Sequence, residues 1–304
     1  MTEINSEYHI PVMLNESIDP LVENNDGVYV DVTFGGGSHS REILSRLSKK
    51  GHLLSFDQDQ DAIENAPDDK RHTMIHNNFM FLRGCVRAAG FDNVDGILAD
   101  LGVSSHHFDT PERGFSFRFD GPLDMRMNQE AILSASDVVN TYSLEQLTKI
   151  IAVYGELDKP MRLASDLLYH RENAPIETIQ QLKDAVRRST PRTGDSKFYA
   201  KLFQALRIEV NQEMRALEMM LQGALKLLKP GGILSVITYH SLEDRLVKNF
   251  MRSGNFEGKV EKDFFGKSLA PFELVNRKPI DPSQEEVEIN PRSRSAKLRV
   301  ARKL

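Results

Sequence analysis

The chain has 304 residues with 40% hydrophobic and 27% charged side chains, the balance of an ordinary soluble globular protein. Its formal net charge of −5 excludes a protein that is basic throughout, but it leaves room for one basic face. The single cysteine, Cys85, excludes an intramolecular disulfide and a Cys-rich zinc site. No apolar run is long enough to span a membrane and no signal-peptide pattern opens the chain, so we expect a cytoplasmic protein.

Short apolar runs alternate with stretches of helical spacing in the N-terminal third of the chain. The predicted strands are residues 28–34, 52–57, 73–79 and 94–101, and the predicted helices are residues 40–47, 61–65 and 81–89. This alternation is typical of βαβ units around a parallel sheet that is buried on both faces. With right-handed crossovers, it predicts a doubly wound α/β fold.

Candidate ligand-binding residues lie at or just after the end of each predicted strand. They are glycines 35–37, Asp57, Phe79 and Asp100. Open α/β sheets bind ligands beyond the carboxyl ends of their strands. Strand ends are also polar or glycine-rich simply because the chain turns there, but four such ends in successive units favour a nucleotide-type ligand.

The glycine loop at residues 35–37 allows a ligand to approach the backbone closely, and the helix after it presents N–H groups. A dinucleotide loop, Gly-x-Gly-x-x-Gly, would require a third glycine where Ser40 stands. Asp57 follows Gly37 by 20 residues, the spacing at which an acidic side chain meets ribose hydroxyls. The pair fits an adenosine-bearing cofactor, either a nicotinamide dinucleotide or S-adenosylmethionine.

A helical block interrupts the α/β pattern and the sheet then resumes. Helices are predicted at residues 160–170, 178–188 and 196–228, and Ser143 with Gln146 forms a capping-box signature before another. Strand character returns at residues 233–239 and near 297–301. We therefore expect a core of residues 1–108 and 204–304 with an inserted, mostly helical domain at 109–203.

Two segments are strongly basic despite the acidic total. Residues 187–207 hold six basic side chains and one acid, and residues 290–304 hold six basic side chains and no acid. Such runs are usually solvated faces. Because both adjoin the predicted cofactor domain, they also suit a polyanionic substrate.

Several longer sequence blocks carry a family resemblance. In chain order they include DVTFGGGSHS (31–40), DLGVSS (100–105), GPLDMRM (121–127), YHSLEDRLVK (239–248) and NPRSRSAKLR (290–299). Together they resemble the RsmH (MraW) family of bacterial ribosomal RNA small-subunit methyltransferases. The resemblance implies a Rossmann-like class I S-adenosylmethionine-dependent methyltransferase core with an inserted helical domain that recognises RNA. It implies methylation of the exocyclic N4 of a cytidine in the decoding region of 16S ribosomal RNA, with the small ribosomal subunit as partner and no metal.

The resemblance also carries cofactor contacts onto particular residues. These are Gly37, Ser38, His39, Asp57, Phe79, Asp100 and His107. Ser38 stands where the family loop usually has a glycine, His107 stands where Gln is frequent, and Tyr239 stands where Phe is common.

Methyl transfer from a sulfonium is an in-line displacement, so it requires alignment and a dry site. An acceptor for a hydrogen of the weakly nucleophilic cytosine N4 would help. The candidates are Asp100, Ser104, Ser105 and His240. For Asp100 we expect orientation of the cofactor rather than base catalysis, and His240 has the alternative of bracing a turn in which Ser241 and Asp244 form a capping pair. His106 and His107 lack the further ligands of a metal site.

A flipped cytosine needs an aromatic or arginine surface to receive it. Arg113, Phe115, Phe117 and Arg126 are candidates for that surface, although the phenylalanines equally suit a hydrophobic seam between the domains. The first basic segment would add Arg187, Arg188 and Arg192 as phosphate contacts.

Two other function classes stay open from the residues alone. A nicotinamide oxidoreductase would need pyrophosphate contacts and a hydride-transfer site, which the sequence does not offer. A noncatalytic RNA-binding protein would not need the pairing of Gly37 with Asp57.

Overall fold

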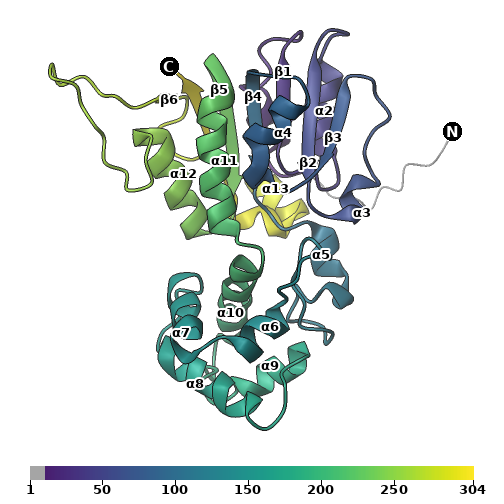
Figure 1. The fold of residues 1–304 in the computed structure, drawn as a ribbon, viewed down its shortest axis with the longest axis vertical. Coiled ribbons are helices and arrows are strands. Elements are labelled where there is room, and N and C mark those ends of the chain that lie inside the picture. The colour runs from purple at the N-terminus through teal and green to yellow at the C-terminus, as the bar shows by residue number, and fades with distance from the viewer. Residues whose placement is uncertain (1–10) are drawn as a thin grey trace. The chain divides into compact units, whose positions relative to one another are not determined.

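The computed structural model describes residues 11–304 and divides the chain into two compact units. One unit comprises Met1–Gly102 and Met214–Leu304, and the other is the insertion Val103–Glu213 (Figure 1). The sequence led us to expect an insertion at residues 109–203. The inserted unit is longer at both ends, because it begins at Val103 and ends at Glu213.

The first unit is built on a seven-stranded mixed sheet in the order β3-β2-β1-β4-β5-β7-β6. The first five strands are parallel, and β7 runs antiparallel to β5 and β6. The strands are β1 (Val28–Asp31), β2 (His52–Asp57), β3 (His72–His76), β4 (Val94–Asp100), β5 (Leu228–Thr238), β6 (Phe272–Leu274) and β7 (Lys297–Lys303). All of the predicted strands are confirmed, whereas β6 was not predicted. The order reverses between β1 and β4, which is the switch point where doubly wound sheets bind ligands.

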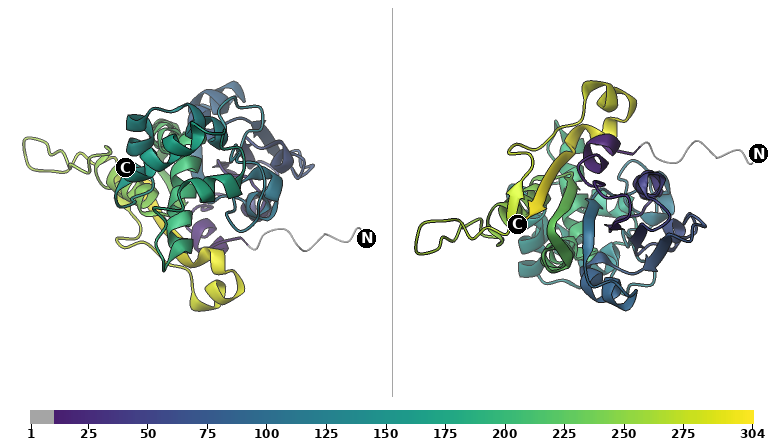
Figure 2. Two further views of the ribbon diagram at one scale, coloured as in Figure 1. Left: turned by 90° about the horizontal axis from the view of Figure 1, so that it is seen from below. Right: turned by 90° about the horizontal axis from the view of Figure 1, so that it is seen from above.

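Helices cover both faces of this sheet, as the predicted doubly wound fold requires (Figures 1 and 2). Adjacent residues of β2 point to opposite faces: Leu53 packs in the core that includes α1 and α2, and Leu54 packs in the core that includes α4, α11 and α12. The helical elements of this unit are α1 (Leu14–Ile18), α2 (Ser38–Arg46), α3 (Gln60–Ile63), η1 (Phe79–Phe81), α4 (Leu82–Ala88), α11 (Glu213–Leu227), α12 (Ser241–Ser253), α13 (Gln284–Ile289) and η3 (Pro291–Ser295).

The inserted unit is helical and has its own hydrophobic core. Its elements are α5 (Ser105–Asp109), η2 (Pro111–Arg113), α6 (Ala135–Thr141), α7 (Leu144–Val153), α8 (Pro160–Arg171), α9 (Ile179–Ala185) and α10 (Asp195–Val210). Ser143 and Gln146 form the predicted capping box at the start of α7. Helix α6, which was not predicted, begins with a capping box of Ser134 and Asp137.

The single helix predicted at residues 196–228 is wrong, because α10 and α11 are separate helices. Gln212 takes a left-handed backbone conformation with φ 50° between them. The side-chain amide of Asn211 donates to the carbonyls of Arg207 at 2.9 Å and Met125 at 2.8 Å, which stabilises the break. The apolar spacing continues on both sides of the break, so periodicity alone could not locate it.

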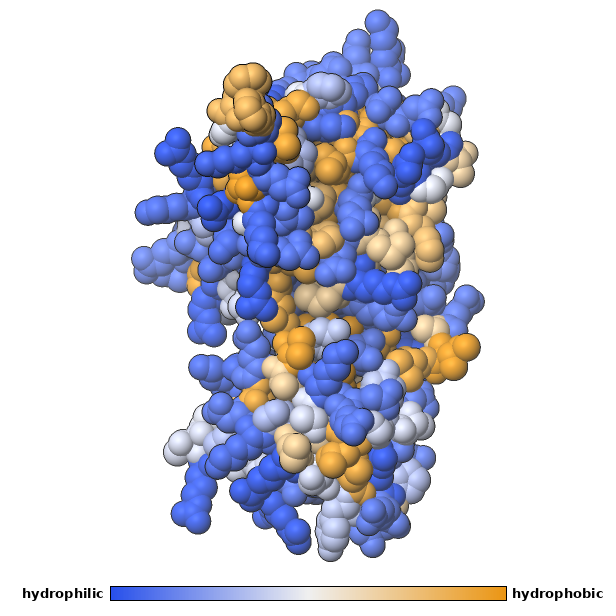
Figure 3. Space-filling model, turned by 60° about the vertical axis from the view of Figure 1, so that its left-hand side comes forward, coloured by the Kyte–Doolittle hydropathy of each residue, from blue (hydrophilic) through white to orange (hydrophobic). Residues whose placement is uncertain are grey.

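No helix within residues 11–304 is long and apolar enough to cross a membrane. The face drawn in Figure 3 is mostly hydrophilic, with smaller hydrophobic areas between the polar side chains.

Candidate functional site

The carboxyl ends of β1, β2 and β4 bring three aspartates to one edge of the sheet. Asp31, Asp57 and Asp100 are the last residues of these strands. Register places Asp31 opposite Ser55 and Leu98, and Asp100 opposite Ile237. The sequence singled out Asp57 and Asp100 as site residues, whereas it did not single out Asp31.

The glycine loop leads from β1 into α2. Gly35 and Gly37 have left-handed φ values of 51° and 76°, and a Cβ on Gly37 would lie 2.6 Å from Cζ of Phe34. Gly37 is the N-cap of α2, and no side chain caps this helix. Ser38 is already helical, so it replaces the family's glycine at a position where a side chain meets no backbone strain.

Asp57 binds the glycine loop directly. Its Oδ2 accepts the N–H of Gly35 at 2.8 Å, and its Oδ1 accepts the N–H of Asp59 at 3.0 Å. The carboxylate at the end of β2 therefore fixes the entry to the loop, close to the place where an adenosine ribose would lie at such a switch point.

Asp31 is completely buried beneath the same loop. Its Oδ2 accepts from the Ser40 hydroxyl at 2.6 Å, and Ser40 Oγ lies 2.8 Å from Ser55 Oγ. Its Oδ1 accepts the N–H of Thr33 at 3.1 Å. Burial raises the pKa of Asp31, although the hydrogen bond from Ser40 opposes this effect. This buried network joins β1, β2 and α2, and it supports the loop from below.

Thr33 connects that network to Asp100. Its Oγ1 accepts the N–H of Asp100 at 2.7 Å. The Oδ1 of Asp100 accepts the hydroxyl of Tyr239 at 2.8 Å, whereas Oδ2 receives no hydrogen bond from the other described residues. Asp100 is partly exposed. One carboxylate oxygen is thus held by the protein, and the other is available to a cationic ligand group.

The Tyr239 hydroxyl remains a donor over the physiological pH range. Burial and the adjacent carboxylate of Asp100 raise the pKa of Tyr239 well above its ordinary value. The sequence noted Tyr239 only as a mild departure from phenylalanine, and no sequence signal links it to Asp100.

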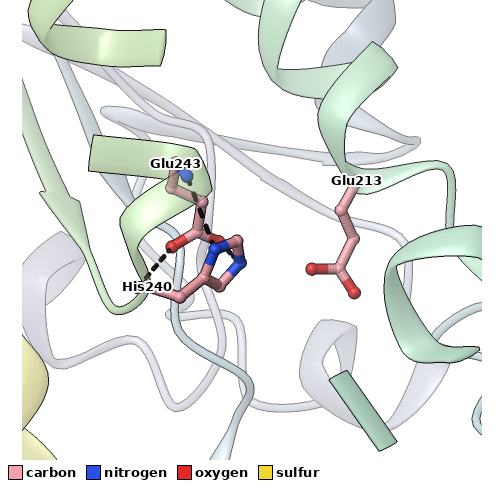
Figure 4. Close-up of side chains that lie close together, drawn as sticks. All are labelled: Glu213, His240 and Glu243. Carbon is pink, nitrogen blue, oxygen red and sulfur yellow. Dashed lines mark hydrogen bonds and ion pairs between the residues drawn. The ribbon is translucent and has the colours of Figure 1, made fainter. Parts of the chain in front are cut away.

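His240 is the N-cap of α12 (Figure 4). Its Nδ1 accepts the N–H of Glu243 at 3.4 Å, so a neutral ring carries its proton on Nε2, which lies 3.0 Å from Oε1 of Glu243. The hydrogen bond of Nδ1 caps α12, which favours the bracing alternative, whereas Nε2 makes no hydrogen bond to the described residues. The expected capping pair of Ser241 with Asp244 is wrong: Ser241 is the first helical residue, and Asp244 pairs with Arg299 at 2.7 Å. Glu213, also drawn in Figure 4, pairs with Arg207 in the helical unit.

Two further residues expected at the cofactor have structural partners. His39 is buried in the first turn of α2, with Nε2 3.1 Å from the carbonyl oxygen of Val12. Phe79 begins η1, where Asn78 caps the turn by accepting the N–H of Met80. Phe79 packs against the core of the sheet but is only partly buried, so part of its surface can still contact a ligand.

The remaining expected cofactor and catalytic residues belong to the helical unit. Ser104 immediately precedes α5, and its carbonyl accepts the N–H of His107. His107 is buried and stacks on Phe115, with ring centroids 4.7 Å apart. Phe115 is buried in the core of this unit, so its ring is not a free platform for a base, whereas Phe117 is only partly buried against that core.

The arginines proposed to receive a base are already engaged. Arg113 is buried, and its guanidinium donates to the carbonyls of Arg126 and Met127 at 3.1 Å. Arg126 binds both carboxylate oxygens of Asp124 at 2.9 and 2.6 Å. These contacts hold the loop of residues 113–127 and argue against a base-stacking role for either arginine.

The two basic segments differ in their exposure. Arg187, Arg188 and Arg192 are exposed on the helical unit. In the C-terminal segment, Arg299 is buried against Asp244, and Arg302 pairs with Glu23 at 2.6 Å. The arginines of the first segment are therefore accessible to a ligand, while part of the second segment stabilises the fold.

Sequence comparisons decide between the ligand classes that fit this site. The model of the MraW methylase family matches residues 6–304. The chain belongs to this family. A protein named "Ribosomal RNA small subunit methyltransferase H" from Parabacteroides distasonis is 58% identical over 305 residues, covering 100% of both chains. One of the same name from Phocaeicola vulgatus is 57% identical over 303 residues, again covering 100% of both.

A solved rRNA methylase from Streptococcus thermophilus is 13% identical, with a TM-score of 0.44, over 97% of this chain and 99% of that one. As a member of the MraW methylase family, the protein is a methyltransferase whose methyl donor is S-adenosylmethionine. The adenosine-bearing cofactor expected from Gly37 and Asp57 is thus identified, and a nicotinamide oxidoreductase is excluded.

Proposed function

We propose that this methylase modifies the exocyclic N4 of a cytidine in the decoding region of 16S ribosomal RNA. The single observation that carries the RNA substrate is the 58% identity, over the full length of both chains, to a protein named for the small-subunit ribosomal RNA. The exposed arginines of the helical unit suit an RNA partner. The choice of N4 and of the decoding region rests on the resemblance of the sequence motifs.

The strand-end residues fit the two polar parts of the cofactor. Asp57 ends β2 beside the glycine loop and suits the ribose hydroxyls, while Gly37 lets the ligand approach the start of α2. Asp100, whose Oδ1 is held by Tyr239, would hold the ammonium of the methionyl part through Oδ2. Phe79 suits the adenine face, because this aromatic residue is partly exposed. When bound, S-adenosylmethionine supplies an electrophilic methyl group on its sulfonium.

The methyl-transfer step depends mainly on alignment. We infer that Asp100 anchors the cofactor and that His240 positions the turn after β5 through Glu243. Among the candidates whose side chains the structure describes, Ser104 remains to accept a hydrogen of cytosine N4, since a serine hydroxyl can act as an acceptor as well as a donor. We assign RNA phosphate contacts to Arg187, Arg188 and Arg192. Arg113 and Arg126 instead stabilise the fold through their carbonyl and carboxylate partners.

The proposal is tested with isotopically labelled S-adenosylmethionine and small ribosomal subunits that lack the modification. Nucleosides from the digested RNA are separated and identified by mass spectrometry, and the modified position is mapped by fragmenting the RNA. We expect label in N4-methylcytidine from one decoding-region position. Label on another base, on cytosine C5 or outside the decoding region would contradict the assignment. A protein that binds the RNA without transferring label would support the noncatalytic alternative.

A further inference from the structure

The turn between β5 and α12 places the Tyr239 hydroxyl against Asp100, the residue proposed to anchor the cofactor. Tyr239 directly follows the last residue of β5, and Asp100 is the last residue of the neighbouring strand β4. The Tyr239 hydroxyl donates to Oδ1 of Asp100 at 2.8 Å. This hydrogen bond is the only one that the Asp100 carboxylate accepts from the described residues.

Three further features fix the place of that hydroxyl. The backbone N–H of Tyr239 donates to Oε2 of Glu243 at 2.9 Å, so the capping box of α12 holds the residue. The ring packs against the core formed with α1 and α2. Its edge also lies over Gly102, where an added Cβ would come within 2.7 Å of Tyr239 Cε2. The glycine of the DLGVSS motif therefore leaves room for this ring.

We propose that Tyr239 is a positioning residue for cofactor binding: its hydroxyl holds Oδ1 of Asp100 and thereby turns Oδ2 toward the ammonium of the methionyl part of S-adenosylmethionine. This inference rests on the proposed role of Asp100 as the cofactor anchor. A phenylalanine at position 239 would fill the same space above Gly102 but would leave the carboxylate free to rotate. Ordering that carboxylate would then reduce the binding free energy.

The inference is tested with two ligands that differ in the part that Asp100 contacts. S-adenosylhomocysteine has the amino group, and methylthioadenosine lacks the whole amino-acid part. We expect Tyr239→Phe to weaken binding of S-adenosylhomocysteine by about 3- to 10-fold, the effect of one lost hydrogen bond, and to leave methylthioadenosine binding unchanged. In an Asp100→Asn background, Tyr239→Phe should cause no further loss, because the two residues act as one unit. Calorimetry on all four proteins completes this double-mutant cycle.

Tyr29→Phe is the matched control. Tyr29 is a buried tyrosine in β1 whose hydroxyl donates to the Asn24 carbonyl at 2.9 Å, so its loss should lower stability without changing the affinity ratio of the two ligands. An equal loss of both ligands in Tyr239→Phe, or additive losses in the double variant, would overturn the positioning role. So would normal S-adenosylhomocysteine binding by Tyr239→Phe when Asp100→Asn binds weakly. Normal binding by Asp100→Asn would instead overturn the anchor role in the proposed function.

Discussion

Ser40 donates to Asp31 at 2.6 Å, and both residues are fully buried beneath the glycine loop. The bond joins the end of β1 to the first turn of α2 across the loop that the cofactor is expected to contact. A carboxyl in this position stabilises the loop through hydrogen bonds, but its charge is costly to bury. The protonation of Asp31 therefore connects the stability of the core to pH.

Asp31→Asn should change the pH dependence of unfolding. Burial raises the pKa of Asp31 above its unfolded value, so its contribution to stability is fully present below the unfolded pKa and is lost as pH rises through the folded pKa. The asparagine does not titrate, and its amide can donate to Ser40 while Ser40 donates to Ser55. We expect wild type to lose stability relative to Asp31→Asn as pH rises, in denaturant unfolding measured from pH 4 to 8 on both proteins.

Ser40→Ala should increase the pH dependence that Asp31→Asn removes. It keeps the Asp31 carboxyl but removes the hydrogen bond that favours its charged form, so the pKa of Asp31 should rise further. The loss of stability at neutral pH should then be larger than in wild type. Parallel pH profiles for wild type, Asp31→Asn and Ser40→Ala would show that Asp31 does not titrate in this range.

Asp57→Ala should weaken binding of every adenosine ligand, in contrast to Asp100→Asn. We expect losses of about 1–3 kcal/mol for both S-adenosylhomocysteine and methylthioadenosine, because the ribose is common to them. Asp95→Ala is the matched control: Asp95 also accepts a backbone N–H, that of Val28 at 2.8 Å, but it lies near the amino end of β4. Unchanged methylthioadenosine affinity in folded Asp57→Ala would remove Asp57 from the ribose site.

Much of the fold and the edge that carries the site could be predicted from the sequence, because strand runs and their end residues are local signals. Residues 52–57 were predicted as a strand and form β2, and Asp57 at its end accepts the N–H of Gly35 in the glycine loop. The Tyr239–Asp100 contact joins residues 139 positions apart and depends on the register of β4 and β5. No local pattern encodes such a register, so this contact required the structure.

The same limit explains the arginine assignments. Composition marks Arg113, Arg126, Arg187 and Arg188 alike as basic residues, although a buried arginine and an exposed one have different uses. Carbonyl and carboxylate partners occupy Arg113 and Arg126, whereas Arg187 and Arg188 are exposed. Exposure, which the sequence does not report, separates fold-stabilising arginines from candidate phosphate contacts.

Arg187→Gln/Arg188→Gln should weaken RNA binding and reduce its salt dependence. For single-stranded RNA, each arginine that neutralises a phosphate adds about 0.7 to the steepness of log K against log salt, so removing two should reduce it by up to about 1.4. Lys49→Gln/Lys50→Gln removes two adjacent exposed charges from the other unit and serves as the matched control. Filter binding across a salt series gives both slopes. Equal slopes for the two double variants would mean that Arg187 and Arg188 form an ordinary solvated face.

Asp100→Asn should separate cofactor anchoring from the methyl-transfer step. The substitution keeps the shape of the side chain, but it removes the charge and makes part of the acceptor a donor. Because Tyr239 already occupies Oδ1 and Oδ2 faces a cationic ligand group in our proposal, we expect binding of S-adenosylmethionine to weaken by about 10-fold or more. Single-turnover methylation at saturating cofactor should then recover to within about 10-fold of wild type, since anchoring affects binding more than transfer.

A deficit of about 100-fold that persists at saturation would show that Asp100 also accepts the N4 proton or aligns the transition state. Calorimetry on the same protein would ensure that the cofactor site is full when the rate is measured.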